Sequence, residues 1–247
     1  LTLVITGCMA ERIGDDFFQE APAVDHVWGT NDKKRIAALL SGGSDERDLE
    51  YSFTQSYYKE GEISSYVPIM NGCDNFCTYC IVPYVRGREV SRSVDSILDE
   101  IAFLEDRGVK EITLLGQNVN SYDTHYNGSH FNFPDLLALI ANRVDSIKWI
   151  RFESPHPKDF SFQLIDVIAS ERSIARHLHI PAQSGSPRVL EAMNRCYTRE
   201  QYLALIGELR AKVPHLTLTT DVMVGFPSES EAEFRETLSL MEEVAFL

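Results

Sequence analysis

Residues 65–92 read SYVPIMNGCDNFCTYCIVPYVRGREVSR, and this stretch decides how the rest of the chain is interpreted. The apolar run Tyr66 to Met70 predicts a strand. Directly after it, Cys73, Cys77 and Cys80 stand at a C-x₃-C-x₂-C spacing. Three thiolates so close together can converge on one iron–sulfur cluster, because thiolate is the usual ligand of such iron. A cluster of four irons held by three thiolates leaves one iron open to a small molecule.

A structural zinc site and a disulfide are the alternatives. Structural zinc takes four ligands, usually as two close pairs, and no second Cys/His pair at finger spacing follows. His125 and His130 lie far downstream, separated by a loop-like YNGS stretch. A disulfide leaves an odd cysteine over and fits a secreted chain. The spacing therefore favours the open cluster, with zinc as the main alternative.

The composition is that of an ordinary globular protein, with 247 residues, 44% hydrophobic and 24% charged. No apolar stretch approaches the ~20 residues that span a bilayer, and no secretory signal opens the chain. Five cysteines, three of them clustered, indicate a reducing, cytoplasmic compartment and metal binding. The net charge of −14 argues against a nonspecific polyanion binder. It leaves room for a local basic surface at Arg86, Arg88 and Arg92.

The pattern of elements predicts two domains. Residues 1–43 run strand, helix (Ala10 to Gln19), strand, helix, like the tail of a small α/β domain. Residues 44–64 are polar and irregular and form the predicted linker. From 65 to 247 strands and helices alternate, which predicts a parallel sheet with right-handed crossovers, curved into a partial barrel. The predicted strands are Tyr66–Asn71, Glu111–Leu115, Ile147–Glu153, His177–Ile180 and Leu216–Val224, and the predicted helices are Val94–Arg107, Pro134–Val144, Lys158–Ser170, Ser186–Met193, Thr198–Val213 and Glu229–Ala245.

The run CTYCIVPYVRGREVSR, with LLGQNVNSY at 114–122, resembles the methylthiotransferase branch of the radical S-adenosylmethionine (SAM) family. The resemblance extends over essentially the whole chain. It implies a (β/α)₆ barrel, whose sixth strand we expect beyond Leu247, and a [4Fe-4S] cluster whose open iron chelates SAM. The stretch TGCMAER around Cys8 resembles the last cysteine motif of the family's amino-terminal domain. There, Cys8 and two cysteines outside this sequence would hold a second, auxiliary [4Fe-4S] cluster.

The resemblance also implies a SAM site in the loops that follow the strands, where a parallel barrel builds its ligand site. Gly116 and Gln117 stand where the family receives the SAM amino group. By position, Glu153 and Ser154 would meet the ribose hydroxyls. Gln183 is the best-placed amide of the next loop.

Two further positions concern the other ends of SAM. Arg195 is expected to pair with the SAM carboxylate. The stretch VGFPSE at 224–229 resembles the family's adenine-side turn, with Ser228 where family members commonly have glycine.

Cys196 fits no spacing pattern and is expected to pack as a small apolar residue. His177 and His179 are expected to line the barrel rather than bind metal.

Within the family, the two motifs are similar to those of the tRNA-modifying branch, which makes 2-methylthio-N6-isopentenyladenosine beside the anticodon. The resemblance implies that SAM and two clusters carry the chemistry and that no side chain is catalytic. Tyr84 and Tyr122 are candidates for stacking on the substrate base. The expected partners are the tRNA anticodon loop and an electron donor such as flavodoxin or ferredoxin. We expect the protein to be a monomer that does not bind a membrane.

Other functions stay open at this point. The substrate of a methylthiotransferase can also be a threonylcarbamoyladenosine of tRNA or an aspartate of a ribosomal protein. From other classes, an iron–sulfur electron carrier or a zinc-stabilised interaction module fits the cysteines. Both ends of the sequence look like cuts through a longer protein. The 247-residue chain is therefore expected to bind at most one stable cluster and not to methylthiolate tRNA by itself.

Overall fold

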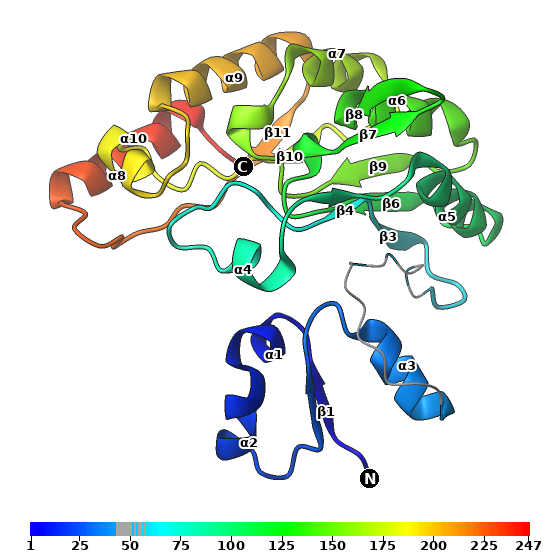
Figure 1. Ribbon diagram of the computed structural model, residues 1–247. Coiled ribbons are helices and arrows are strands. Elements are labelled where there is room, and N and C mark those ends of the chain that lie inside the picture. The colour runs from blue at the N-terminus through cyan, green and yellow to red at the C-terminus, as the bar shows by residue number, and fades with distance from the viewer. Residues whose placement is uncertain (43–50, 52, 54–55, 57) are drawn as a thin grey trace. The chain divides into compact units, whose positions relative to one another are not determined.

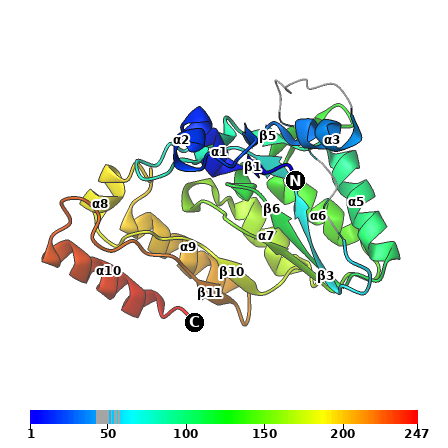
Figure 2. The same ribbon diagram turned by 90° about the horizontal axis from the view of Figure 1, so that it is seen from below.

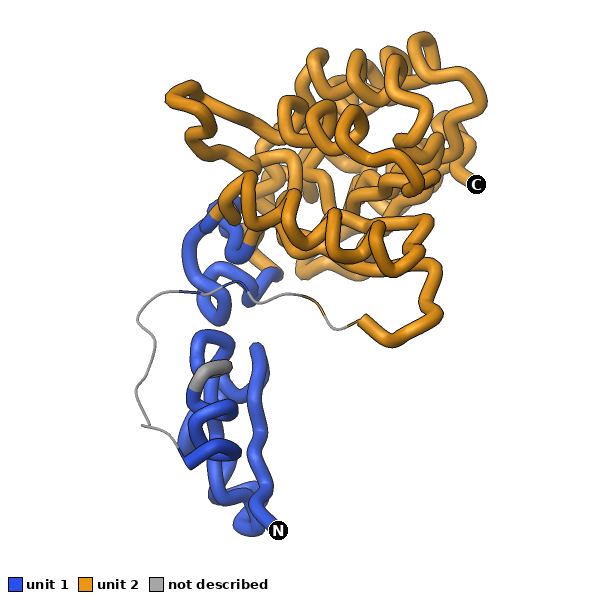
Figure 3. Tube along the Cα trace, turned by 90° about the vertical axis from the view of Figure 1, so that its right-hand side faces the viewer, with its two compact units in different colours: residues 1–54, 71–76, 80–90 blue, residues 55–70, 77–79, 91–247 orange. Residues whose placement is uncertain are grey.

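The computed structural model describes residues 1–42, 51, 53, 56 and 58–247, and Figure 1 shows its helices and strands. The chain forms two compact units, coloured separately in Figure 3. Unit 1 comprises residues 1–54, 71–76 and 80–90, and unit 2 comprises residues 55–70, 77–79 and 91–247. The cysteine segment thus contributes to both units. Of the predicted linker 44–64, residues 44–50, 52, 54, 55 and 57 lie outside the described residues.

Unit 1 contains two short parallel strands with helices after each. Its elements are β1 (Val4–Thr6), α1 (Cys8–Ile13), the 3₁₀ turn η1 (Gly14–Asp16), α2 (Phe17–Glu20), β2 (His26–Trp28), α3 (Lys33–Ser41) and α4 (Val82–Arg86). The predicted alternation of strand and helix in the first residues of the chain is confirmed for the described residues. The single helix predicted from Ala10 to Gln19 is wrong, because Gly14 takes φ 59° and ψ −138°, which no α-helix accommodates.

Unit 2 is built on parallel strands that follow one another in chain order. The strands are β3 (Ser64–Pro68), β6 (Glu111–Leu115), β9 (Trp149–Phe152), β10 (His177–His179) and β11 (Thr217–Thr219). β3, β6 and β9 pair in parallel, as do β10 and β11. A parallel bridge from Ile150 to Ile174 joins β9 to the segment that leads into β10. The predicted parallel α/β architecture is confirmed for these strands.

The helices of unit 2 cover the outside of this sheet. They are α5 (Val94–Asp106), α6 (Phe133–Arg143), α7 (Phe162–Ser170), α8 (Pro187–Ala192), α9 (Arg199–Lys212) and α10 (Glu231–Val244). Figure 2 shows α5, α6, α7, α9 and α10 following one another along the strands. A parallel sheet needs such crossovers, so each strand is followed by a loop at the same edge.

The core of unit 2 lies between these helices and the sheet. On α5, Val94, Ile97, Ile101 and Leu104 are buried at helical spacing, so one stripe of the helix faces the core. In β6, the middle strand of its sheet, Ile112, Thr113 and Leu114 are all buried. A strand buried on both faces is typical of parallel sheets.

Several helices begin at capping residues that the sequence supplies. Asn132 and Asp135 form a capping box on α6, Thr198 and Gln201 on α9, and Ser230 and Glu233 on α10. Each box satisfies backbone N–H groups that the first turn of a helix leaves free. No helix in the described part of the chain is long and apolar enough to cross a bilayer.

The sequence interpretation missed a β-hairpin in unit 2. The YNGS stretch, taken as a loop, is the turn between β7 (Asp123–Tyr126) and β8 (Ser129–Asn132). Asn127 and Gly128 have φ 50° and 78°, as a two-residue type I′ turn requires. The Asn127-Gly128 pair is the feature of the sequence from which the hairpin could have been predicted. The hairpin places His125 opposite His130, with the two rings edge to face.

A buried ion pair links α5 to β3. Arg92 and Glu100 are almost fully buried and form a salt bridge. Arg92 also donates to the carbonyl of Pro68 (3.2 Å), at the end of β3. Two buried charges cost much desolvation free energy, which only close pairing offsets.

Replacing Glu100→Gln should therefore lower the free energy of unfolding by about 3 kcal/mol, because the Arg92 charge loses its buried counter-charge. Urea denaturation followed by circular dichroism measures the change. The matched control is Glu231→Gln, which breaks an exposed ion pair with Arg235 on α10 and should cost less than ~1 kcal/mol. Equal effects of the two substitutions would contradict the assignment.

Candidate functional site

The loops after the strands of unit 2 carry most of the residues singled out in the sequence. Gly116 and Gln117 follow β6, Glu153 and Ser154 follow β9, and Gln183 follows β10. The carboxyl ends of parallel strands share one edge of a sheet, where ligands of α/β folds bind. The fold therefore brings these loops to the same edge of unit 2.

The cysteines of the C-x₃-C-x₂-C run are all free thiols. Cys73 and Cys77 are 8% and 9% exposed, and Cys80 is half-buried. Cys73 and Cys80 belong to unit 1, Cys77 to unit 2. In the described part of the chain, no group of three or more His, Cys, Asp or Glu side chains is arranged to hold a metal ion. Cys8, half-buried at the start of α1, is likewise a free thiol.

The backbone of the cysteine segment is held within unit 1 by the residues that follow α4. The N–H of Cys73 donates to the carbonyl of Gly87 (3.2 Å), and Arg88 forms an ion pair with Asp74 (3.2 Å). Gly72 has φ 83°, and a Cβ there would lie 2.0 Å from the carbonyl oxygen of Arg88. Only glycine permits this approach, so the position just before Cys73 excludes a side chain.

An exposed aromatic pair stands on the same segment. Phe76 and Tyr84 pack edge to face, with ring centroids 6.0 Å apart. The guanidinium of Arg88 lies 4.9 Å from the centre of the Phe76 ring. Tyr84 is 73% exposed. Phe76 has φ 48°, a strained value for a bulky residue, and such strain persists only where the surroundings enforce it.

The other tyrosine expected to stack on a base does not face solvent. Tyr122 is 1% exposed, and its hydroxyl donates to the carbonyl of Arg92 (2.6 Å). Burial raises its pKa. The expectation for Tyr122 is wrong, because a loop position in the sequence did not reveal its packing into the core. The prediction that Cys196 packs as a small apolar residue is also wrong, because its side chain is exposed.

Asparagines of the β6 loop tie it to the β9 loop. The N–H of His156 donates to the side-chain oxygen of Asn120 (2.8 Å), and Asn120 donates back to the carbonyl of His156 (2.9 Å). Asn118 donates to a carboxylate oxygen of Asp159 (2.8 Å). These bonds fix the backbone next to Gly116 and Gln117 relative to the loop with Glu153. Gly116 itself has no room for a side chain, since a Cβ would lie 2.4 Å from Cγ of Met70.

His156 is buried within this network. Burial lowers its pKa to about 2, and the nearby charges of Arg195 and Lys158 act in the same direction. Its Nδ1 accepts from the N–H of Lys158 (3.3 Å), so the neutral ring carries its proton on Nε2. The ring stands edge to face on Tyr197, at 5.7 Å between centroids. His156 is thus held as a neutral ring within the loop network.

Gln183 and Ser154 occupy strained backbone positions. Gln183 has φ 63°, and its backbone bonds to the strand continuation at Asp221 (2.9 Å) and Met223 (2.8 Å). Ser154 has φ 60° and is exposed, next to half-buried Glu153. The backbone of the Gln183 loop is therefore fixed by strand pairing.

Arg195 lies just after α8 and is 5% exposed. This burial was not predicted from the sequence. Its guanidinium donates to the carbonyl of Pro181 (3.1 Å), the hydroxyl of Tyr197 (3.2 Å) and Sγ of Cys77 (3.6 Å). Of the predicted site residues, Arg195 and Cys77 are thus in direct contact.

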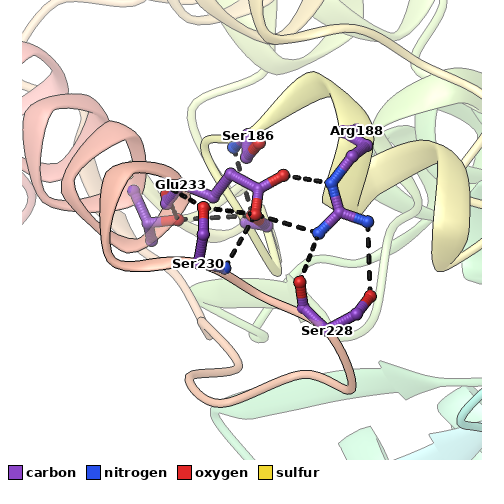
Figure 4. A network of polar contacts seen from close by, with 7 residues as sticks. Ser186, Arg188, Ser228, Ser230 and Glu233 are labelled. Carbon is purple, nitrogen blue, oxygen red and sulfur yellow. Dashed lines mark hydrogen bonds and ion pairs between the residues drawn. The ribbon is translucent and has the colours of Figure 1, made fainter.

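A polar network holds the turn after β11, and Figure 4 shows it from close by. Arg188 on α8 pairs with Glu233 on α10 and donates to the carbonyl of Ser228 (2.7 Å). Ser228 has φ 68°, which explains why glycine suits this position. Glu229 accepts from the N–H of Gly225 and closes the turn (2.6 Å). Arg188 therefore supports a turn in which Ser228 carries the backbone strain.

The hydrogen bond from Arg188 and those from Ser230 lower the pKa of Glu233 to about 2. A carboxyl group whose folded-state pKa is depressed adds stability above its unfolded pKa of ~4.3 and loses it as the pH falls toward the folded value. Arg188→Gln should therefore lower the urea midpoint at pH 6, by a difference that shrinks as the pH falls from 5 toward 3. Arg235→Gln serves as control for an exposed pair on the same helix. A difference that is independent of pH would contradict the role of the Arg188–Glu233 pair.

Comparisons with known proteins agree with this geometry. The family model "Radical SAM superfamily" matches residues 67–241. A protein of Treponema pallidum named tRNA-2-methylthio-N(6)-dimethylallyladenosine synthase is 47% identical over 99% of this chain and 58% of its own length. A protein of the same name from Bacteroides fragilis is 47% identical over 98% of this chain and 55% of its own length. The chain thus spans a little over half the length of these relatives.

Solved structures share the fold at low sequence identity. The cobalamin-dependent SAM radical enzyme OxsB, with aqua-cobalamin and SAM bound, matches 97% of this chain and 38% of its own, with a TM-score of 0.62 and 14% identity. The radical SAM methyltransferase TsrM from Kitasatospora setae, with cobalamin and a [4Fe-4S] cluster, matches 73% of this chain and 34% of its own, with a TM-score of 0.60 and 18% identity. At such identities the likeness concerns the fold.

Proposed function

Because the chain belongs to the radical SAM superfamily, we propose that it supplies the SAM-cleaving part of a methylthiotransferase that acts on the tRNA anticodon loop. The observation that carries the proposal is the run Cys73, Cys77, Cys80 directly after the first strand of a parallel α/β unit. Relatives at 44–47% identity that are named tRNA-2-methylthio-N(6)-dimethylallyladenosine synthase support the choice of reaction.

The three thiols are not gathered around one metal position in the described residues, but the chemistry of this donor set is that of a [4Fe-4S] cluster. Three free thiols stand in one segment, and Sγ of Cys77 accepts a hydrogen bond from the buried guanidinium of Arg195. When bound, the cluster and SAM supply a one-electron cleavage whose 5′-deoxyadenosyl product removes hydrogen from C2 of the adenine. The protein's share is to hold SAM and the base and to exclude water.

The loops at the strand edge are the proposed SAM site. Gly116 and Gln117 would receive the amino group, and the bonds between the β6 and β9 loops support their backbone. Glu153 and Ser154 would meet the ribose. Gln183 would offer its amide beside them. The turn at 225–229, closed by Glu229, would take the adenine.

The auxiliary cluster is proposed for Cys8, with cysteines that this sequence does not contain. A half-buried free thiol at the start of α1 is available for such a role. One thiolate alone does not hold a cubane, so sulfur insertion would require the remaining ligands. An electron donor of the flavodoxin or ferredoxin type, a monomeric state and a cytoplasmic location complete the proposal.

The exposed Phe76–Tyr84 pair is the proposed platform for the substrate base. An unpaired anticodon-loop base can be splayed out and stacked on an aromatic face. Tyr84 offers such a face, and Arg88, which contacts Phe76, adds a positive charge for the RNA backbone.

Replacing any one of Cys73, Cys77 and Cys80 with alanine should abolish SAM cleavage, because the open-site cluster needs all three thiolates. Iron and sulfide per chain, with 5′-deoxyadenosine formed after anaerobic reconstitution, measure the effect. Cys196→Ala is the matched control, since this exposed thiol should not serve the cluster. A Cys77→Ala chain that forms 5′-deoxyadenosine at the original rate would show the cluster assignment to be wrong.

The substrate is tested by hydrogen transfer. Anticodon stem-loop RNA with N6-isopentenyladenosine deuterated at C2 should pass deuterium into 5′-deoxyadenosine, detected by mass spectrometry. Tyr84→Ala should raise the Kd for this RNA roughly 5- to 100-fold through lost stacking. Phe162→Ala, at an exposed aromatic of α7, is the control. Deuterium transfer from a ribosomal protein peptide, with none from the RNA, would overturn the substrate assignment.

A further inference from the structure

Arg195 is a buried cation whose contacts all lie within unit 2. The side chain is 5% exposed, and two of its donors go to neutral groups, the Pro181 carbonyl and the Tyr197 hydroxyl. Among the described residues, no Asp or Glu forms an ion pair with it. Its Nη1 donates to Sγ of Cys77 at 3.6 Å.

A buried guanidinium requires a counter-charge, because desolvation penalises an isolated ion. Arginine cannot escape this by losing its proton, since its pKa is too high. Of the groups that Arg195 contacts, the Cys77 sulfur is the one that would bring negative charge, as a ligand of the proposed cluster. The geometry therefore pairs the cation with a proposed cluster ligand of the same unit.

Independent bonds keep the two partners in place. The residue after Cys77, Thr78, donates from its N–H to the carbonyl of Met193 (3.1 Å) and from its hydroxyl to the carbonyl of Ala192 (2.9 Å). These acceptors lie at the end of α8, a few residues before Arg195. Within unit 2, the backbone at Cys77 and Thr78 is thus held against the residues that precede Arg195.

Tyr197 holds the other side of the guanidinium. Its hydroxyl accepts from Nε of Arg195 and donates to the carbonyl of Ala182 (2.7 Å). Its ring lies 5.3 Å from the guanidinium carbon and packs on the buried ring of His156. Arg195 is consequently fixed by contacts that need no ligand.

We propose that Arg195 is a positioning residue that donates to the Cys77 thiolate and raises the reduction potential of the cluster bound there. The inference rests on the proposed cluster. Hydrogen bonds to the sulfur ligands and nearby charge are among the factors that set such potentials. Reduction adds one negative charge, so a fixed cation beside the sulfur favours the reduced form.

The test uses the reconstituted 247-residue chain and its Arg195→Gln and Arg195→Lys variants. Iron per chain reports cluster assembly, and a dithionite titration followed by electron paramagnetic resonance reports the midpoint potential. Equilibrium dialysis reports SAM binding. Arg199→Gln is the control, since Arg199 pairs with Glu243 on α10. We expect full iron loading, a shift to a more negative potential in Arg195→Gln, a smaller shift in Arg195→Lys and no shift in the control.

Several results would overturn the inference. An unchanged potential in a fully loaded Arg195→Gln chain would remove the tuning role. Weaker SAM binding at an unchanged potential would assign the guanidinium to the SAM carboxylate instead. Loss of iron from both variants would make Arg195 an assembly residue rather than a tuning one. Failure of the unsubstituted chain to take up iron would instead count against the proposed function itself.

Discussion

The parallel pairing of β3, β6 and β9 is the constraint on which the arrangement of unit 2 depends. Parallel neighbours cannot be joined by a tight turn, so each strand must be followed by a helix that returns along the outside. The connections that leave the strands then share one edge, whatever their sequences. Gly116, Gln117 and Gln183 lie in these connections, where the pairing of strands no longer dictates the side chain.

Hydrogen bonds between neighbouring segments hold the loops at this edge of the sheet in place. The Asn120–His156 pair joins the β6 and β9 loops, and Arg188 joins α8 to the turn after β11. Loops of this kind are mobile unless their backbone groups find partners. Since these partners are protein groups, the loops can hold their conformation before a ligand arrives, which reduces the ordering cost of binding.

The sequence predicted the strands and helices of unit 2 well, because their patterns are governed by local periodicity. β6 was predicted with the bounds it has, and α5 and α6 differ from their predictions by one residue at one or both ends. The helix predicted from Lys158 begins only at Phe162, and the strand predicted to reach Val224 ends at Thr219. Thr198 caps α9 through its side chain, and Ser93 occupies the N-cap position of α5 without a side-chain hydrogen bond. Such features depend on neighbours along the chain, and a single sequence displays them directly.

What the sequence could not predict depends on contacts between distant residues. The sequence places both Tyr84 and Tyr122 in loops after a strand, but Tyr84 is exposed on the short helix α4 and Tyr122 is buried in the core. Burial of Arg195 depends on Pro181, Tyr197 and Cys77, of which Cys77 lies over a hundred residues away. The hairpin at Asn127-Gly128 was different, because its turn signal was present and was outweighed by the polarity of the stretch.

Several loop residues of the candidate site have strained backbone conformations. Phe76, Ser154, Gln183 and Ser228 have positive φ although none is glycine, and each lies in a connection that leaves a strand or its continuation. Each such residue costs free energy that packing elsewhere in the fold must offset. A turn without a function could relax by accepting glycine. Ser154 and Gln183 carry a side chain at such a position in the loops after β9 and β10, which supports the proposal that these two loops contribute to the ligand site.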